Sequence, residues 1–240
     1  MAPSTIWLAT GYEMPLVGFG IWKVTREATA DTVYNGIRRA IADGLVKHED
    51  LSIATKLWNN YHKQYFDLYL IHFPVALKYI DPAVHQFPLL YDVLNYSRRP
   101  ISTLQIEHHP FLVQPNPIAL AQESGIAVTG YLSFGPQSFL EIPIFKQKTN
   151  NVTLLEHPTI IAIAAARSKT PAQVFVRWAT QCNIAVTPKS NNVKRLPQNL
   201  DVLSFGLTAE EIAHISGFDI GLQFNDPAFY LNNQSLRIFA

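Results

Sequence analysis

Short apolar segments alternate with helix-like segments along most of this chain, and this alternation constrains the fold more than any other feature. The runs Phe66–His72, Thr103–Glu107 and Ile126–Tyr131 have the length of single strands. Several strands of the chain are apolar on both faces, as in parallel sheets that are covered by helices. The sequence therefore predicts an α/β fold with buried parallel strands.

The remaining elements are expected from the same patterns, and about six core strands are predicted in all. The other strands are expected at residues 16–20, 51–56 and 184–186, and helices at residues 27–42, 88–96, 117–123, 158–168 and 171–181. A last helix is expected to open at Thr208 with a pattern like a capping box, which Glu211 would complete. The turn Gly11–Pro15 predicts an N-terminal β-hairpin ahead of the main fold.

Composition and charge exclude several classes of protein. The chain has 240 residues, of which 48% are hydrophobic and 15% charged, as in a globular protein with a large core. The net charge of +1 gives no electrostatic reason to expect nucleic acid or a membrane surface as a partner. A single cysteine, Cys182, suits a reducing compartment, and no secretory signal or membrane-spanning run is apparent. We expect a cytoplasmic protein.

Polar side chains follow several predicted strands at their carboxyl ends. Lys56, His72, Tyr131 and Lys189 fall at or just past the ends of different strands, where α/β barrels and open α/β sheets place their sites. The glycine-rich phosphate loops G-x-G-x-x-G and G-x-x-x-x-G-K-[ST] are both absent from the sequence.

The stretch after the last predicted strand is a candidate phosphate site. It brings together Lys189, Ser190, Asn191 and Arg195, and a helix is expected to begin near Arg195. Cationic side chains beside a helix N-terminus favour an anion, most simply a phosphorylated nucleotide. A polar loop between a strand and a helix is the alternative interpretation.

Two further patterns affect the fold and the site. Only residues 57–65 separate the strand that ends at Lys56 from the next strand, whereas a parallel crossover with its helix needs at least about 10–12 residues. A helix is therefore expected to be absent at this point. The pair His108–His109 offers two metal-ligating side chains, but adjacent strand residues face opposite sides and no third ligand has zinc spacing. No metal site is therefore predicted.

Seven short stretches, taken together and in order, resemble the aldo-keto reductases, and within that family the fungal and yeast D-xylose reductases. They are Gly18–Lys23, Thr55–Asn60, Leu70–Pro74, Leu104–Pro110, Tyr131–Phe139, Pro188–Asn191 and Phe224–Pro227. The resemblance covers nearly the whole chain. It implies a single domain over residues 1–240, a (β/α)8 barrel of the TIM-barrel type, which this chain would build only incompletely. It also implies NADPH, or sometimes NADH, as cofactor for reducing an aldehyde or aldose, as in D-xylose to xylitol.

The resemblance also implies roles for individual residues. Lys56 and His72 are similar to two members of the family's catalytic tetrad. Gln105 would hold the nicotinamide amide, and Tyr131 would stack on the nicotinamide ring. The remaining cofactor-binding residues would follow the pyrophosphate, the ribose or its phosphate, and the adenine: Ser133, Phe134, Gln137, Ser138, Glu141, Lys189, Ser190, Asn191, Arg195, Gln198 and Asn199. Trp22, His72 and Asn225 would line the substrate pocket, and the protein would be a monomer or homodimer.

The chain departs from the family pattern in three places. The family's catalytic tyrosine and aspartate lie in a motif like D-x-A-x-x-Y-G-N-E, but here Ile37–Arg38 runs directly into Arg39–Gly44, as if two helices were fused. The helix after Asn60 is missing, and so are much of the substrate loop, a helix and a strand near Gln86–Leu89. Either the protein itself is shortened or the natural polypeptide contains further segments.

These departures leave three functional hypotheses open. The first is an NAD(P)H-dependent aldose reductase, which would be slow without the tyrosine that donates the proton. The second is a catalytically impaired relic that binds NADP or regulates through it. The third is a chain that does not fold stably.

Overall fold

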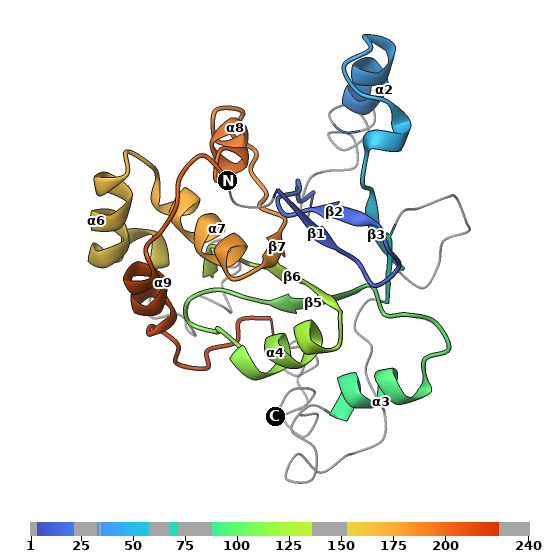
Figure 1. Ribbon diagram of the computed structural model, residues 1–240. Coiled ribbons are helices and arrows are strands. Elements are labelled where there is room, and N and C mark those ends of the chain that lie inside the picture. The colour runs from blue at the N-terminus through green and yellow to red at the C-terminus, as the bar shows by residue number, and fades with distance from the viewer. Residues whose placement is uncertain are drawn as a thin grey trace, which may run out of the picture. The chain divides into compact units, whose positions relative to one another are not determined.

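A computed structural model describes residues 4–21, 33, 35–57, 68–71, 88–135 and 153–225 of the chain (Figure 1). The described residues fall into two compact units. The first comprises Met1–Gly20 with Leu90–Ala240, and the second comprises Ile21–Leu89.

The first unit contains a parallel sheet in the strand order β5 (Thr103–Glu107), β6 (Ala127–Tyr131) and β7 (Ile184–Val186). An N-terminal segment extends this sheet beyond β7, because Val17 forms a parallel bridge with Val186. The hydrogen bonds from Gly18 N to Val186 O (2.8 Å) and from Gly20 N to Pro188 O (3.1 Å) continue this pairing. The parallel α/β arrangement predicted from the sequence is confirmed, but the described strands do not show a closed barrel.

Helices cover one face of this sheet. They include α4 (Pro115–Glu123) and α7 (Pro171–Gln181), whose apolar side chains form one buried cluster with Val128, Ile184 and Val186 of the strands. The sequence stabilises the N-terminus of α7, because Pro171 occupies its first turn and Thr170 and Gln173 form a capping box. This unit also contains α6 (Pro158–Ala166), α8 (Arg195–Leu200), α9 (Ala209–Ser216) and the 3-10 turn η4 (Leu154–Glu156).

The predicted N-terminal hairpin and the last capping box are both confirmed. Strands β1 (Thr5–Trp7) and β2 (Glu13–Pro15) pair antiparallel. At the start of α9, Glu211 N donates to Thr208 Oγ1 at 3.1 Å and Thr208 N donates to Glu211 Oε2 at 2.7 Å. The helix predicted from residue 117 begins two residues earlier, at Pro115.

The second unit contains helix α2 (Asn35–Ala42), the 3-10 turn η2 (His48–Asp50) and the parallel pair β3 (Ala54–Leu57) and β4 (Leu68–Ile71). Helix α2 runs without interruption through Arg38 and Arg39. This agrees with the prediction that two helices are fused there. Strand β3 begins at Ala54 rather than at residue 51. Helix α3 (Pro88–Tyr96), predicted over the same residues, begins at the boundary between the units. None of the helices in the described ranges is long and apolar enough to span a bilayer.

Gly20 is required where the N-terminal segment lies against the end of β7. A Cβ atom at this position would lie 2.5 Å from the backbone oxygen of Thr187, closer than carbon and oxygen can approach without a shift. We expect Gly20→Ala to lower the free energy of unfolding by about 1–3 kcal/mol, the usual cost of overpacking. Urea denaturation measures this change. Gly206→Ala is the control, because a Cβ there meets nothing within 4 Å; equal midpoints for the two variants would contradict the close packing at Gly20.

Candidate functional site

The face of the sheet opposite the helices is polar. Every second side chain of β5 faces this side, namely those of Thr103, Gln105 and Glu107. The register places Gln105 beside Thr129 of β6 and Glu107 beside Tyr131. The hydroxyl oxygens of Thr103 and Thr129 lie 3.2 Å apart, which shows that these side chains share one face. Gln105 and Tyr131, both predicted to contact the nicotinamide, therefore lie on the same face of neighbouring strands.

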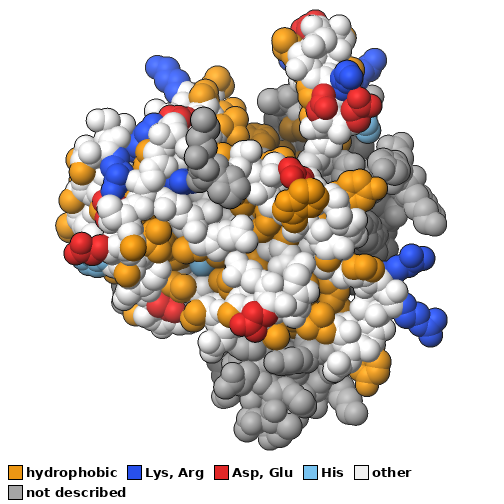
Figure 2. Space-filling model, in the orientation of Figure 1, with side chains coloured by type: hydrophobic (Ala, Val, Ile, Leu, Met, Phe, Trp, Pro, Cys, Tyr) orange, Lys and Arg blue, Asp and Glu red, His pale blue; other side chains and the backbone are white. Residues whose placement is uncertain are grey.

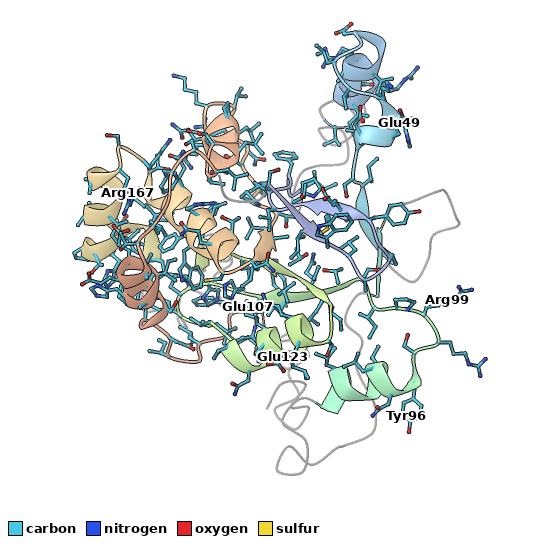
Figure 3. All side chains as sticks on the ribbon, in the orientation of Figure 1. Glu49, Tyr96, Arg99, Glu107, Glu123 and Arg167 are labelled. Carbon is cyan, nitrogen blue, oxygen red and sulfur yellow. The ribbon has the colours of Figure 1, made fainter. Side chains whose placement is uncertain are left out.

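Glu107 ends β5 as a buried carboxylate, with its side chain 1% exposed (Figure 3). Its Oε1 accepts hydrogen bonds from His109 Nε2 at 2.9 Å and from the backbone N–H of Phe224 at 2.7 Å. Its Oε2 accepts from the backbone N–H of Asn225 at 2.8 Å. These N–H donors satisfy the carboxylate, and they attach a segment more than a hundred residues later in the chain to the end of β5.

Tyr131 and Asn225, predicted as separate cofactor and substrate contacts, are brought together by the structure. The side-chain amide of Asn225 donates from Nδ2 to the hydroxyl oxygen of Tyr131 at 3.2 Å. The tyrosine lies at the carboxyl end of β6 and is half-buried. The carboxyl ends of β5 and β6 and the segment at Asn225 thus form one polar cluster.

The loop after β6 turns sharply and carries two predicted pyrophosphate contacts. Leu132 and Gly135 have positive φ angles of 60° and 68°, and Gly135 N donates to Leu132 O at 2.7 Å. Between them, Ser133 is buried and Phe134 packs against the hydrophobic core. Three predicted contacts that follow, Gln137, Ser138 and Glu141, lie outside the described residues.

The candidate phosphate site after β7 has the predicted order of strand, polar loop and helix. Ser190 Oγ accepts from Asn192 N at 3.1 Å, which shapes the loop, and α8 then begins at Arg195. Lys189 and Ser190 are half-buried. Asn191, Arg195 and Gln198 are exposed to solvent, and Asn199 is buried. Figure 2 shows Lys and Arg side chains projecting from the region of α8. The short helix alone is no anion site, so any phosphate would depend on these side chains.

The predicted catalytic residues belong to the second unit. The backbone of Lys56 lies in β3, in register with Leu70 of β4, and its side chain lies outside the described residues. His72 directly follows β4 and, like Trp22, lies outside the described residues. The roles of these three residues stay predictions.

The hydrogen-bonding role of Glu107 was not predicted from the sequence. The signal was present, because Gln105 and Glu107 are two residues apart on a strand and must share a face. His108 and His109 were considered from the sequence as one pair of possible metal ligands, whereas their surroundings in the structure differ. His109 bonds to Glu107, while His108 stacks on Trp178 with ring centroids 4.6 Å apart and an interplanar angle of 6°.

The buried His108 predicts a pH dependence of stability. Burial lowers the pKa of His108 from 6.5 to about 4, and the neighbouring His109 acts in the same direction. Between these two values the unfolded chain binds a proton that the folded chain does not, so stability falls as the pH falls from 6.5 towards 4. The loss is expected to reach about 3 kcal/mol.

The variant His108→Gln lacks this titration. Its free energy of unfolding, measured by urea denaturation at several pH values, is expected to decline less than that of the wild type over the same interval. Parallel curves for the two proteins would show that His108 is protonated in the folded state as readily as in the unfolded one.

The sequence model of the Aldo/keto reductase family matches residues 89–220. The chain is 43% identical over 315 residues to a protein of Aspergillus clavatus named "Probable NAD(P)H-dependent D-xylose reductase xyl1", with 97% of this chain and 95% of that protein covered. It is 41% identical over 313 residues to "NAD(P)H-dependent D-xylose reductase xyl1" of Aspergillus niger, with 96% of this chain and 98% of that protein covered.

The length of the first alignment shows that the relative contains internal residues that this chain lacks. The alignment extends over 315 positions, whereas the chain has 240 residues, so at least 75 positions have no counterpart in it. This agrees with the segments that the sequence analysis found to be missing.

Proposed function

Because the chain belongs to the aldo/keto reductase family, we propose that it reduces an aldose, of which D-xylose is the first candidate, with NADPH or NADH as the reductant. One observation carries the proposal beyond the family assignment. Gln105, Tyr131 and Asn225 lie on one polar sheet face and its end, in the unit that also carries Lys189 and Arg195. Aromatic and amide groups suit a nicotinamide, and cations suit a phosphate.

The proposed architecture is an incomplete (β/α)8 barrel that forms one domain over residues 1–240. The order of β5, β6, β7 and the segment at Val17 supports it, because a barrel pairs its first strand with its last. We further propose a cytoplasmic protein that acts as a monomer or homodimer on a small-molecule substrate.

The residues of the chain fit a nicotinamide coenzyme. The structure offers a carboxamide (Gln105), an aromatic ring (Tyr131) and cationic side chains (Lys189 and Arg195) in the same unit. When bound, the coenzyme supplies a hydride to the carbonyl carbon of the substrate. Gln105 would hold the nicotinamide amide, Tyr131 would face its ring, and Lys189 and Arg195 would bind the ribose phosphate.

The proposed roles of Lys56 and His72 concern the carbonyl oxygen. His72 would donate a hydrogen bond that orients the carbonyl. The positive charge of Lys56 would lower the pKa of a neighbouring acid, which would then donate a proton to the oxygen. In the family pattern this acid is a tyrosine, and helix α2 runs through the position where its segment would join.

A second candidate function follows from that continuous helix. Without the proton donor, the chain would bind NADP and turn over slowly or not at all. NADPH oxidation in the presence of D-xylose, with xylitol identified as product, distinguishes the two. Tryptophan fluorescence measures NADPH binding in the same preparation. Product formation supports the reductase, binding without product supports the relic, and absence of both rejects the proposed function for this chain.

A further inference from the structure

We propose that Glu107 is a positioning residue, which anchors Phe224 and Asn225 to the end of β5 so that Asn225 fixes the ring of Tyr131 for the nicotinamide. The inference concerns how the proposed coenzyme site is held together, and its part about the coenzyme rests on the proposed function.

The carboxylate of Glu107 holds the distant segment directly. Glu107 uses both oxygens for the backbone of the distant segment, with Phe224 N on Oε1 and Asn225 N on Oε2. A buried carboxylate needs such donors, because an ionised group without hydrogen bonds is costly to bury. His109 Nε2 is the third donor to the carboxylate; it also binds Oε1 and holds the carboxylate in this orientation.

The side chain of Phe224 packs closely against its surroundings. This side chain is 1% exposed, and its ring lies 5.0 Å from that of His109 between centroids. The ring also approaches the loop after β6, since a Cβ at Gly135 would lie 3.9 Å from Phe224 Cε2. The anchored segment is therefore fixed against the ends of both β5 and β6.

Asn225 connects Glu107 to Tyr131. Because the backbone of Asn225 is held by Glu107, its side-chain amide has a defined starting point for the 3.2 Å hydrogen bond to the tyrosine hydroxyl. Nδ2 of an asparagine can only donate, so the hydroxyl oxygen accepts. A ring that is hydrogen-bonded at its hydroxyl loses little freedom when it stacks on a ligand, and such preorganisation increases affinity.

The test uses two variants that break different links. Glu107→Gln keeps the size of the side chain but replaces one acceptor oxygen by an NH₂ group, which faces an N–H donor. Asn225→Ala keeps the backbone N–H groups that Glu107 binds and removes the side-chain donor to Tyr131. Glu123→Gln is the matched control, because it makes the same chemical change at an exposed position of α4 (Figure 3).

Amide hydrogen exchange without coenzyme reports the anchor. We expect the amides of Phe224 and Asn225 to exchange at least about 10-fold faster in Glu107→Gln, and at wild-type rates in Asn225→Ala and Glu123→Gln. Unchanged exchange in Glu107→Gln overturns the anchor, whether or not the chain binds a coenzyme.

Coenzyme titration reports the link to Tyr131. We expect Glu107→Gln and Asn225→Ala each to weaken the binding of NADPH and of NADH by the same factor, about 10-fold. The factor is the same because both coenzymes carry the nicotinamide. A loss confined to NADPH, or wild-type affinity in Asn225→Ala, overturns the positioning role. A wild-type chain that binds neither coenzyme rejects the proposed function and with it the positioning role, while the exchange experiment still decides the anchor.

Discussion

Replacing Lys189 and Arg195 together by methionine is expected to weaken NADPH binding by about 100- to 10,000-fold, while NADH binding changes by less than about 3-fold. The reason is that a hydrogen bond to a charged group contributes about 1.5–3 kcal/mol, and the two cations would share the ribose phosphate that only NADPH carries. Arginine is suited to this role because its guanidinium can bind two phosphate oxygens at once. Fluorescence titration with each coenzyme measures the two dissociation constants.

Lys194→Met provides the control for this experiment. Lys194 is the exposed residue immediately before Arg195 and has no predicted contact with the coenzyme. Its loss changes the net charge by the same amount as each single substitution, so it reports any general electrostatic effect. The single variant Lys189→Met is compared with this control. If Lys194→Met weakened the binding of NADPH as much as Lys189→Met does, the loop after β7 would act as a diffuse positive surface and not as a phosphate site.

Reduction of D-xylose by this chain is expected to be about 100- to 10,000-fold slower than reduction by a fungal relative that contains the proton-donor tyrosine. Helix α2 is continuous through Arg38 and Arg39, so the described part of this region has no strand that could carry the motif. Hydride transfer would then produce an alkoxide whose proton must come from solvent. The value of kcat under saturating NADPH, measured for both proteins, gives the factor.

A general-acid buffer tests the cause of this slow turnover. If the proton donor alone is missing, the rate should rise with the concentration of a small acid such as imidazolium at constant pH and ionic strength. The relative with its own donor should respond little. Equal kcat values for the two proteins would show that another side chain of this chain supplies the proton.

Local patterns in the sequence predicted the elements of the fold well. The helix at residues 171–181 was predicted at its observed bounds from the proline in its first turn, and the structure adds the capping box of Thr170 and Gln173. The segment 16–20 was predicted as a strand, and in the structure it pairs with β7 through an isolated bridge at Val17. Closure of the sheet into a barrel is a long-range property, and strand patterns alone did not determine it.

The candidate site was predicted in part. Gln105 and Tyr131 were selected by resemblance, and the register of β5 and β6 places them on one face. The hydrogen bonds of Glu107 to Phe224 and Asn225 were not predicted, since they join residues 117 and 118 positions apart in the sequence. No local pattern specifies such a pairing, although the strand alternation does specify which face Glu107 occupies.

Calorimetric titration of the purified chain with NADPH tests the central claim most directly, namely that the polar ends of the strands in the first unit bind a nicotinamide coenzyme. We expect saturable heat with a stoichiometry of one coenzyme per chain, and weaker binding of NADH. An absence of heat with both coenzymes, from a chain whose circular dichroism shows that it is folded, would contradict the account.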